Sequence, residues 1–164
     1  MSAWWQQVGA TLQAEFSDLS DPAILTRTTV RLLLAAALGG VLGYERETRG
    51  KAAGFRTHIL VSLGAALFVL IPQQSKVTDA DMTRVVQGLV AGIGFIGAGA
   101  ILRNTDSGQI EGLTTAAGIW LTAAIGVAVG MGREATAIFA TVLALGVLSM
   151  LPRIPTASPP PPQK

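Results

Sequence analysis

The chain has 164 residues, of which 50% are apolar and 13% charged, with a mean hydropathy of +0.51. Because soluble domains carry about 25% charged residues, this composition predicts a membrane protein. The net charge of +2 then reports membrane topology rather than binding to nucleic acid, which we do not expect as a partner. The lack of Cys excludes disulfides and thiolate zinc sites, and the single His argues against a His-rich metal centre.

The N-terminal residues 1–21 read as a separate interfacial segment. Within them, apolar side chains recur at steps of three or four on one predicted helical face: Trp4, Val8, Leu12, Phe16 and Leu19. This spacing predicts an amphipathic helix over residues 3–19. Its polar face has no Lys or Arg, so attraction to anionic lipid does not explain it, whereas two adjacent tryptophans suit a membrane interface. We expect it on the membrane surface or against the rest of the protein.

Five apolar runs follow. The first begins after Ser20-Asp21-Pro22, a typical helix start, and covers residues 22–44. The others cover residues 57–71, 85–102, 113–130 and 135–151, each 15 to 18 residues long, so flanking polar residues must complete the spans. We predict an all-α fold: a polytopic membrane bundle of five transmembrane helices within residues 22–151, preceded by the interfacial helix. Residues 152–164 form a proline-rich tail.

Basic residues between the spans predict the orientation. The side with the first loop, residues 45–56, carries seven of them: Arg46, Arg49, Lys51, Arg56, Arg103, Arg153 and Lys164. The other side carries five: Arg27, Arg31, Lys76, Arg84 and Arg133. The positive-inside rule therefore places the first loop and the C-terminus in the cytoplasm and the N-terminus outside.

Glycine is concentrated in residues 85–120, and small residues recur at four-residue intervals in several spans. Such residues let helix backbones approach closely in lipid. We therefore expect residues 85–120 to be the contact core of the bundle, with the first, third and fourth spans crossing closely. The predicted packing positions are Gly39, Gly43, Gly88, Gly92, Gly94, Gly97, Gly118, Gly126 and Gly130.

Several polar residues lie within or beside the apolar runs: Arg31, Arg103, Thr114, Thr115 and Trp120. Arg31 is the deepest charge, and a basic residue at the centre of a span costs about 2.5–3.5 kcal/mol. It either extends to the interface or faces a polar partner inside the bundle. The hydroxyls of Thr114 and Thr115 are candidates for lining a pore.

Three motifs carry a family resemblance. They are GYERETRGKAAGFRTHILVSLGAALF at residues 43–68, GIGFIGAGAILR at 92–103 and GLTTAAGIWLTAAIGVAVGMG at 112–132. The chain resembles the MgtC/SapB family of bacterial inner-membrane proteins. The resemblance implies a five-helix membrane domain with a periplasmic N-terminus, and a link to survival at low magnesium and inside host cells. It also implies that the F-type ATP synthase is a partner, which such proteins inhibit. The family has in addition long been described as magnesium transporters.

The chain ends in the proline-rich tail, whereas MgtC-like members continue into a soluble cytoplasmic domain. It therefore resembles the shorter SapB-type members, and a role of that domain is not carried over.

The first loop and its span borders are the candidate functional surface: Glu45, Arg46, Arg56, Thr57 and His58. Glu45 and Arg49 are four residues apart, which is the favourable order for a helical ion pair. Arg56 can present a planar guanidinium to carbonyls or to an anionic group. The simpler alternative is that these charges only set topology.

The sequence supports two functions of different class. No apolar run contains a carboxylate, although Mg²⁺ prefers carboxylate oxygens. We therefore favour a non-catalytic regulator that binds another membrane protein through its glycine faces and basic loop. The alternative is a transporter or channel for Mg²⁺ or another cation. It would be an oligomer, because five short helices of one chain enclose little space for a pore. We assign no catalytic residue, no metal ligand and no cofactor.

Overall fold

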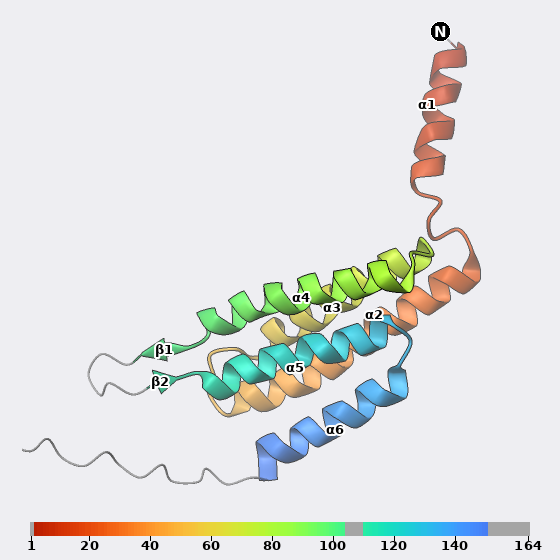
Figure 1. Ribbon diagram of the computed structural model, residues 1–164. Coiled ribbons are helices and arrows are strands. Elements are labelled where there is room, and N and C mark those ends of the chain that lie inside the picture. Colours follow the sequence, from red (N-terminus) through yellow and green to blue (C-terminus); the bar gives the residue numbers. More distant parts are fainter. Residues whose placement is uncertain (1, 104–109, 151–164) are drawn as a thin grey trace, which may run out of the picture.

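The computed structural model of the protein describes residues 2–103 and 110–150. Six helices follow in order: α1 Ser2–Glu15, α2 Pro22–Thr48, α3 Phe55–Gln74, α4 Asp79–Gly99, α5 Leu113–Gly130 and α6 Glu134–Met150. Two short strands, β1 (Leu102–Arg103) and β2 (Ile110–Glu111), pair antiparallel between α4 and α5. The predicted all-α class is confirmed, with this small ladder as an addition (Figure 1).

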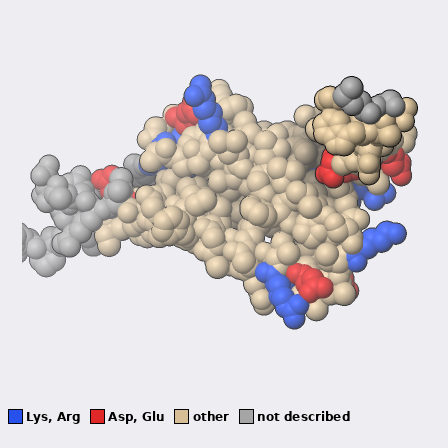
Figure 2. Space-filling model, turned by 90° about the horizontal axis from the view of Figure 1, so that it is seen from above, with Lys and Arg blue, Asp and Glu red and all other residues tan. Residues whose placement is uncertain are grey.

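Four of the described helices, α2 to α5, are long and apolar enough to cross a membrane. The fifth predicted span is α6, which is apolar but has only 17 residues, at the lower limit for spanning hydrocarbon. The predicted count of five is therefore approximate. The broad middle of the face shown in Figure 2 consists of uncharged residues, with Lys, Arg, Asp and Glu toward its ends, as a lipid-facing belt requires.

Helices α2 to α6 run back and forth along a common direction (Figure 1). One end of the bundle, which we call the loop end, holds the α2–α3 loop at residues 49–54 and the two strands. The other end, the turn end, holds the α3–α4 turn at residues 75–78 and the α5–α6 turn at residues 131–133. The two ends carry separate polar clusters.

Helix α1 points away from the bundle instead of lying against it (Figure 1). Trp4 and Trp5 are exposed and meet edge to face with their ring centroids 4.4 Å apart. The helix ends at Glu15, earlier than predicted, because a turn follows in which the Ser17 hydroxyl donates to the Ala14 carbonyl at 2.6 Å. Phe16 and Leu19 consequently lie beyond the end of the helix in which we had placed them.

Local sequence explains where the first two bundle helices begin. Asp21 Oδ1 accepts a hydrogen bond from Ala23 N at 2.8 Å, and Pro22 occupies the first turn, which confirms the predicted helix start. Helix α3 begins after Gly54, which has no side chain to cap it. Glu47 supplies the cap from α2, because its Oε2 accepts from Phe55 N at 2.8 Å across the loop.

Helix α3 packs closely against both α2 and α5. A Cβ added to Gly39 of α2 would lie 2.6 Å from the His58 carbonyl oxygen, and one added to Gly43 would lie 2.7 Å from Phe55 Cα. On the α5 side, a Cβ at Gly130 would lie 2.8 Å from the Ala66 carbonyl oxygen, and one at Gly126 would collide with that of Ser62. Only glycine permits backbones to approach so closely.

The prediction that residues 85–120 form the contact core is wrong for α4. An added Cβ would meet nothing within 4 Å at Gly88, Gly92 or Gly94, and at Gly97 it would make only an ordinary contact of 3.7 Å with Ala116. Within one chain α4 is peripheral, and the second span, not the third, lies between the first and fourth. Glycine spacing indicates a capacity for close packing but does not say which neighbour uses it.

Candidate functional site

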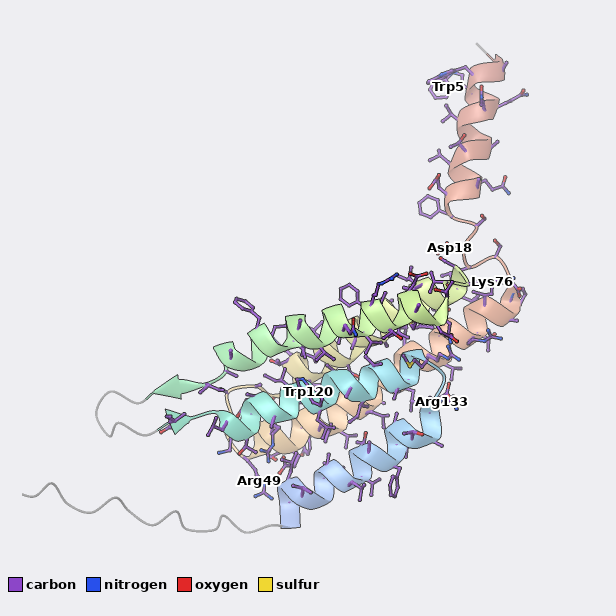
Figure 3. All side chains as sticks on the ribbon, viewed as in Figure 1. Trp5, Asp18, Arg49, Lys76, Trp120 and Arg133 are labelled. Carbon is purple, nitrogen blue, oxygen red and sulfur yellow. The ribbon has the colours of Figure 1, made fainter. Side chains whose placement is uncertain are left out.

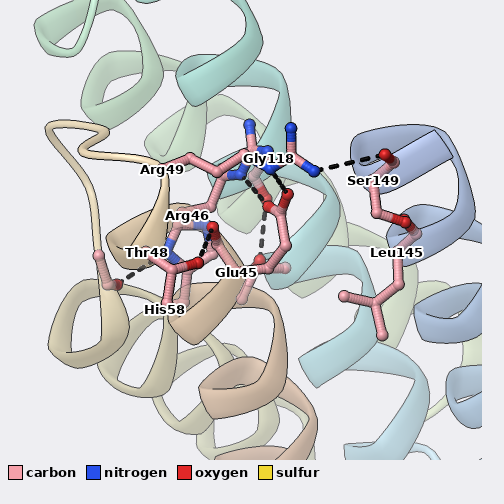
Figure 4. Close-up of polar contacts among 10 residues, drawn as sticks. Glu45, Arg46, Thr48, Arg49, His58, Gly118, Leu145 and Ser149 are labelled. Atoms are coloured by element: carbon pink, nitrogen blue, oxygen red, sulfur yellow. Dashed lines mark hydrogen bonds and ion pairs between the residues drawn. The ribbon is translucent and has the colours of Figure 1, made fainter. Parts of the chain in front are cut away.

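A buried charge cluster lies at the loop end, where α2 finishes. Arg46 is only 3% exposed, and its Nε lies 2.5 Å from Glu45 Oε2. Arg49 Nε lies 2.6 Å from Glu45 Oε1, which confirms the predicted pair at four-residue spacing. This second contact is electrostatic, because its geometry is not that of a hydrogen bond. One carboxylate is thus held between two guanidinium groups (Figure 4).

Arg49 also connects this cluster to α6. Its Nη2 donates to the Ser149 carbonyl oxygen at 3.3 Å (Figure 4). Carbonyls in the last turn of a helix have no partner within the helix, and a basic side chain there satisfies one of them. The sequence contains no signal for this role of Arg49, because Ser149 lies 100 residues further along the chain.

His58 lies beside the charge cluster in the first turn of α3 and is 1% exposed. Its Nδ1 is 2.9 Å from the Gly54 carbonyl oxygen, which can only accept, so we assign the proton to Nδ1 and leave Nε2 as an acceptor. Nε2 has no hydrogen-bond partner among the described residues, and neither has the buried hydroxyl of Ser62, one turn further along. Gly118 of α5 lies beside the ring, where an added Cβ would make only an ordinary contact of 3.6 Å with Nε2.

The other residues of this region differ in exposure, and Ala53 is buried in the core. Arg56 is exposed and makes no ion pair within residues 2–103 and 110–150, and Thr57 is half-buried. Gly50 has a left-handed backbone with φ of 62°, and Gly54 lies against Glu47, whose Oε2 would be 2.6 Å from an added Cβ. The predicted functional surface therefore divides into a buried part with Glu45, Arg46 and His58 and an exposed part with Arg56.

The other polar residues that we predicted lie apart from this cluster and differ in their exposure. Thr115 is buried in the first turn of α5, whereas Thr114 is exposed and Trp120 is 47% exposed. The backbone of Arg103 lies in β1, and its side chain lies outside the described part of the structure. Thr122 is fully buried and donates to its own helix at the Gly118 carbonyl oxygen, 2.8 Å away.

A second polar cluster lies at the turn end and is centred on Arg31. Its Nη1 donates to Gln73 Oε1 at 2.7 Å and to the Gly130 carbonyl oxygen at 2.9 Å, and its Nε lies 3.3 Å from Glu134 Oε1. Arg31 therefore faces polar partners between the helices, the second of the two outcomes that its depth allowed. One guanidinium joins α2 to α3, α5 and α6.

Gly132 in the α5–α6 turn makes room for Arg31. It has φ of 77°, and the guanidinium occupies the space that a Cβ would need. Among the described residues, no group of three or more His, Asp or Glu side chains forms a cluster that could hold a metal ion. An ion pair from Arg31 to Glu134 links α2 to α6 at the turn end, and a hydrogen bond from Arg49 to Ser149 links the same helices at the loop end.

The fold and these clusters define a multi-pass helical membrane protein in which arginines link helices at both ends of the bundle, Arg31 to Glu134 and Arg49 to Ser149. The model of the MgtC family matches residues 32–157, and the chain belongs to this family. The match includes the whole loop-end cluster.

Individual relatives agree with this assignment. The chain is 43% identical over 128 residues to the protein named "Putative magnesium transporter YhiD" of Escherichia coli K12. This alignment covers 74% of the chain and 59% of YhiD. It is 42% identical over 135 residues to SrpB of Synechococcus elongatus, covering 76% of this chain and 74% of SrpB. It is 43% identical over 117 residues to MgtC of Salmonella typhimurium, an alignment that covers 71% of this chain and 48% of MgtC. The chain thus spans about three fifths of YhiD and about half of MgtC. No solved structure matches it.

Proposed function

We propose that the protein is a non-catalytic protein of the bacterial inner membrane that serves adaptation to low magnesium by binding a transmembrane helix of another membrane protein. The observation that carries this proposal is an apolar groove of about 640 Å³ between α3 and α4. Its lining includes Gly64 and Phe68 of α3 and Gly88, Gly92 and Ile96 of α4.

The glycines of the groove favour a helix as its occupant. At Gly64, Gly88 and Gly92 an added Cβ would meet nothing within 4 Å, so these glycines are not required by packing within the chain. Lipid chains adapt to any apolar surface, whereas a helix backbone gains contacts that only small residues permit. Gly88 and Gly92 have the four-residue spacing of a helix-pairing face.

The exposed basic residues of the loop end give such a partner a second contact. Lys51 in the α2–α3 loop is half-buried, and Arg56 in the first turn of α3 is exposed. Charges of this kind favour an acidic loop on the partner and increase the rate of encounter. By family resemblance, the partner we propose is the membrane sector of the F-type ATP synthase.

Crosslinking from the groove tests this proposal. The native chain has no Cys, so Gly92→Cys can carry a benzophenone label, with Val142→Cys on the exposed face of α6 as the matched control. We expect an adduct with a membrane subunit of the ATP synthase from position 92 and not from position 142. Gly92→Leu, which fills the groove, should impair growth in magnesium-poor medium at unchanged protein abundance. An adduct only with a second copy of the chain, or normal growth of Gly92→Leu, would contradict the proposal.

The second candidate function is a cation transporter, which the name of YhiD supports. Purified protein in liposomes that contain a fluorescent Mg²⁺ indicator distinguishes the two functions. A regulator leaves Mg²⁺ entry at the level of protein-free liposomes. Entry that increases with the amount of protein would favour the transporter instead.

We further propose that the loop end faces the cytoplasm and the N-terminus the periplasm. Ala52 in the α2–α3 loop and Ser75 at the α3–α4 turn are both exposed and lie at opposite ends of the bundle. In intact cells an impermeant thiol reagent should label Ser75→Cys and not Ala52→Cys. The reverse pattern would invert the orientation.

A further inference from the structure

A second groove, of about 620 Å³, lies at the turn end between α2 and the start of α6. Its α2 wall includes Ala23, Thr26, Arg27, Val30 and Arg31, which share one helical face because they recur at four-residue spacing. Glu134, the first residue of α6, forms the opposite wall. The groove is therefore apolar along part of its length and holds two guanidinium groups against one carboxylate.

The two arginines of this groove differ in what they contact. Arg31 is occupied inside the bundle by Gln73, the Gly130 carbonyl and Glu134, and its pair with Glu134 uses the only carboxylate in the groove wall. Arg27, one turn nearer the end of α2, is exposed and makes no ion pair among the described residues. The Asp21 carboxylate caps α2 and forms no ion pair with Arg27. Arg27 therefore leaves one positive charge uncompensated.

The position of Arg27 matches the depth of a lipid phosphate. It lies five residues after Pro22, about 7–8 Å along the helix, where the apolar belt meets the polar end. Beyond it, Val30 continues the groove toward the middle of the bundle. A guanidinium binds phosphate oxygens in a planar, bidentate manner, and a lipid without a cationic head group offers it a full negative charge. The acyl chain would then follow the apolar part of the groove.

We propose that the α2–α6 groove is a binding site for an anionic glycerophospholipid, whose phosphate contacts Arg27 and whose acyl chain lies along Ala23 and Val30. This site is separate from the α3–α4 groove and does not depend on the function proposed above. It also differs from the role expected for α1, which has no Lys or Arg.

Native mass spectrometry of the full chain in detergent tests this site, with phosphatidylglycerol and phosphatidylethanolamine of identical acyl chains as probes. Arg27→Ala should reduce the retained phosphatidylglycerol about fivefold, the effect of one basic residue near a lipid surface. Ala23→Trp, which fills the groove and keeps every charge, should reduce it similarly. Lys76→Ala is the matched control, because Lys76 is an exposed cation at the same end and does not line the groove.

Each outcome of this experiment decides the proposal. Selective loss of phosphatidylglycerol from Arg27→Ala and Ala23→Trp, with Lys76→Ala unchanged, would support it. Equal retention of both lipids by the wild type, or equal losses in Arg27→Ala and Lys76→Ala, would overturn it. Displacement of the lipid by millimolar sn-glycerol 3-phosphate would assign the site to a free phosphate ester instead. Thermal unfolding in lipid-free detergent checks that each variant is folded.

Discussion

Gly126→Ala is expected to destabilise the protein by about 1–3 kcal/mol, the usual cost of overpacking. The added methyl group would collide with the Ser62 carbonyl oxygen and lie 3.0 Å from Ala65 Cβ. A backbone carbonyl cannot rotate away as a side chain can, so α3 and α5 must separate. Because this crossing lies at the centre of the bundle, contacts on both sides of it are lost. Thermal unfolding in detergent, followed by size-exclusion chromatography, measures the effect.

Gly92→Ala is the control for Gly126→Ala, with the same chemical change in another span. An added Cβ at Gly92 meets nothing within 4 Å, and alanine is favoured over glycine within a helix by about 1 kcal/mol. The two variants should therefore shift the unfolding temperature in opposite directions. Similar destabilisation by both would show that α4 is packed as tightly as α5, contrary to the structure.

Arg46→Met is expected to reduce the free energy of unfolding by about 1.5–3 kcal/mol, the contribution of a hydrogen bond to a charged group. Methionine keeps the apolar stem of the side chain but removes the guanidinium that lies 2.5 Å from Glu45 Oε2. Glu45 would keep only Arg49, whose side chain is 48% exposed and screened by solvent. A partly buried carboxylate would then be poorly compensated.

Arg56→Met provides the control for Arg46→Met, because it removes the same charge from the same loop region. Arg56 is exposed and makes no ion pair with any described residue, so its replacement should change stability by less than about 0.5 kcal/mol. Urea titration in detergent gives both values. Equal stability of the two variants would show that the loop-end cluster does not hold the bundle together.

The sequence predicted well those features that depend on local chemistry. Apolar length located the spans, the Asp21-Pro22 pair located the start of α2, and spacing predicted the contact between Glu45 and Arg49. The burial of Arg46 could also have been predicted. Gly43 follows Gly39 by four residues and Arg46 follows Gly43 by three, so all three lie on the face of α2 that packs against α3. We had read that residue as a loop charge because of its sequence neighbours.

Features that depend on the choice of neighbour could not be predicted in the same way. In lipid, apolar residues face either the bundle or the membrane, so hydropathy does not separate the central α3 from the peripheral α4. Helix α3 achieves its position with Ser62, Ala65 and Ala66, which form no glycine stripe. The contacts of Arg49 with Ser149 and of Arg31 with Glu134 join residues about 100 positions apart. Only the folded bundle brings them together.

The unequal lengths of the helices have a consequence for the surrounding membrane. Helix α2 has 27 residues and is about 40 Å long, whereas α6 has 17 residues and is about 26 Å long. A bilayer with about 30 Å of hydrocarbon therefore fits neither side of the bundle. It must thin by a few Å beside α6, or α2 must tilt, at a cost of a fraction of a kcal/mol per Å of mismatch. The protein would accordingly be surrounded by a bilayer of uneven thickness, thinner along α6 than along α2.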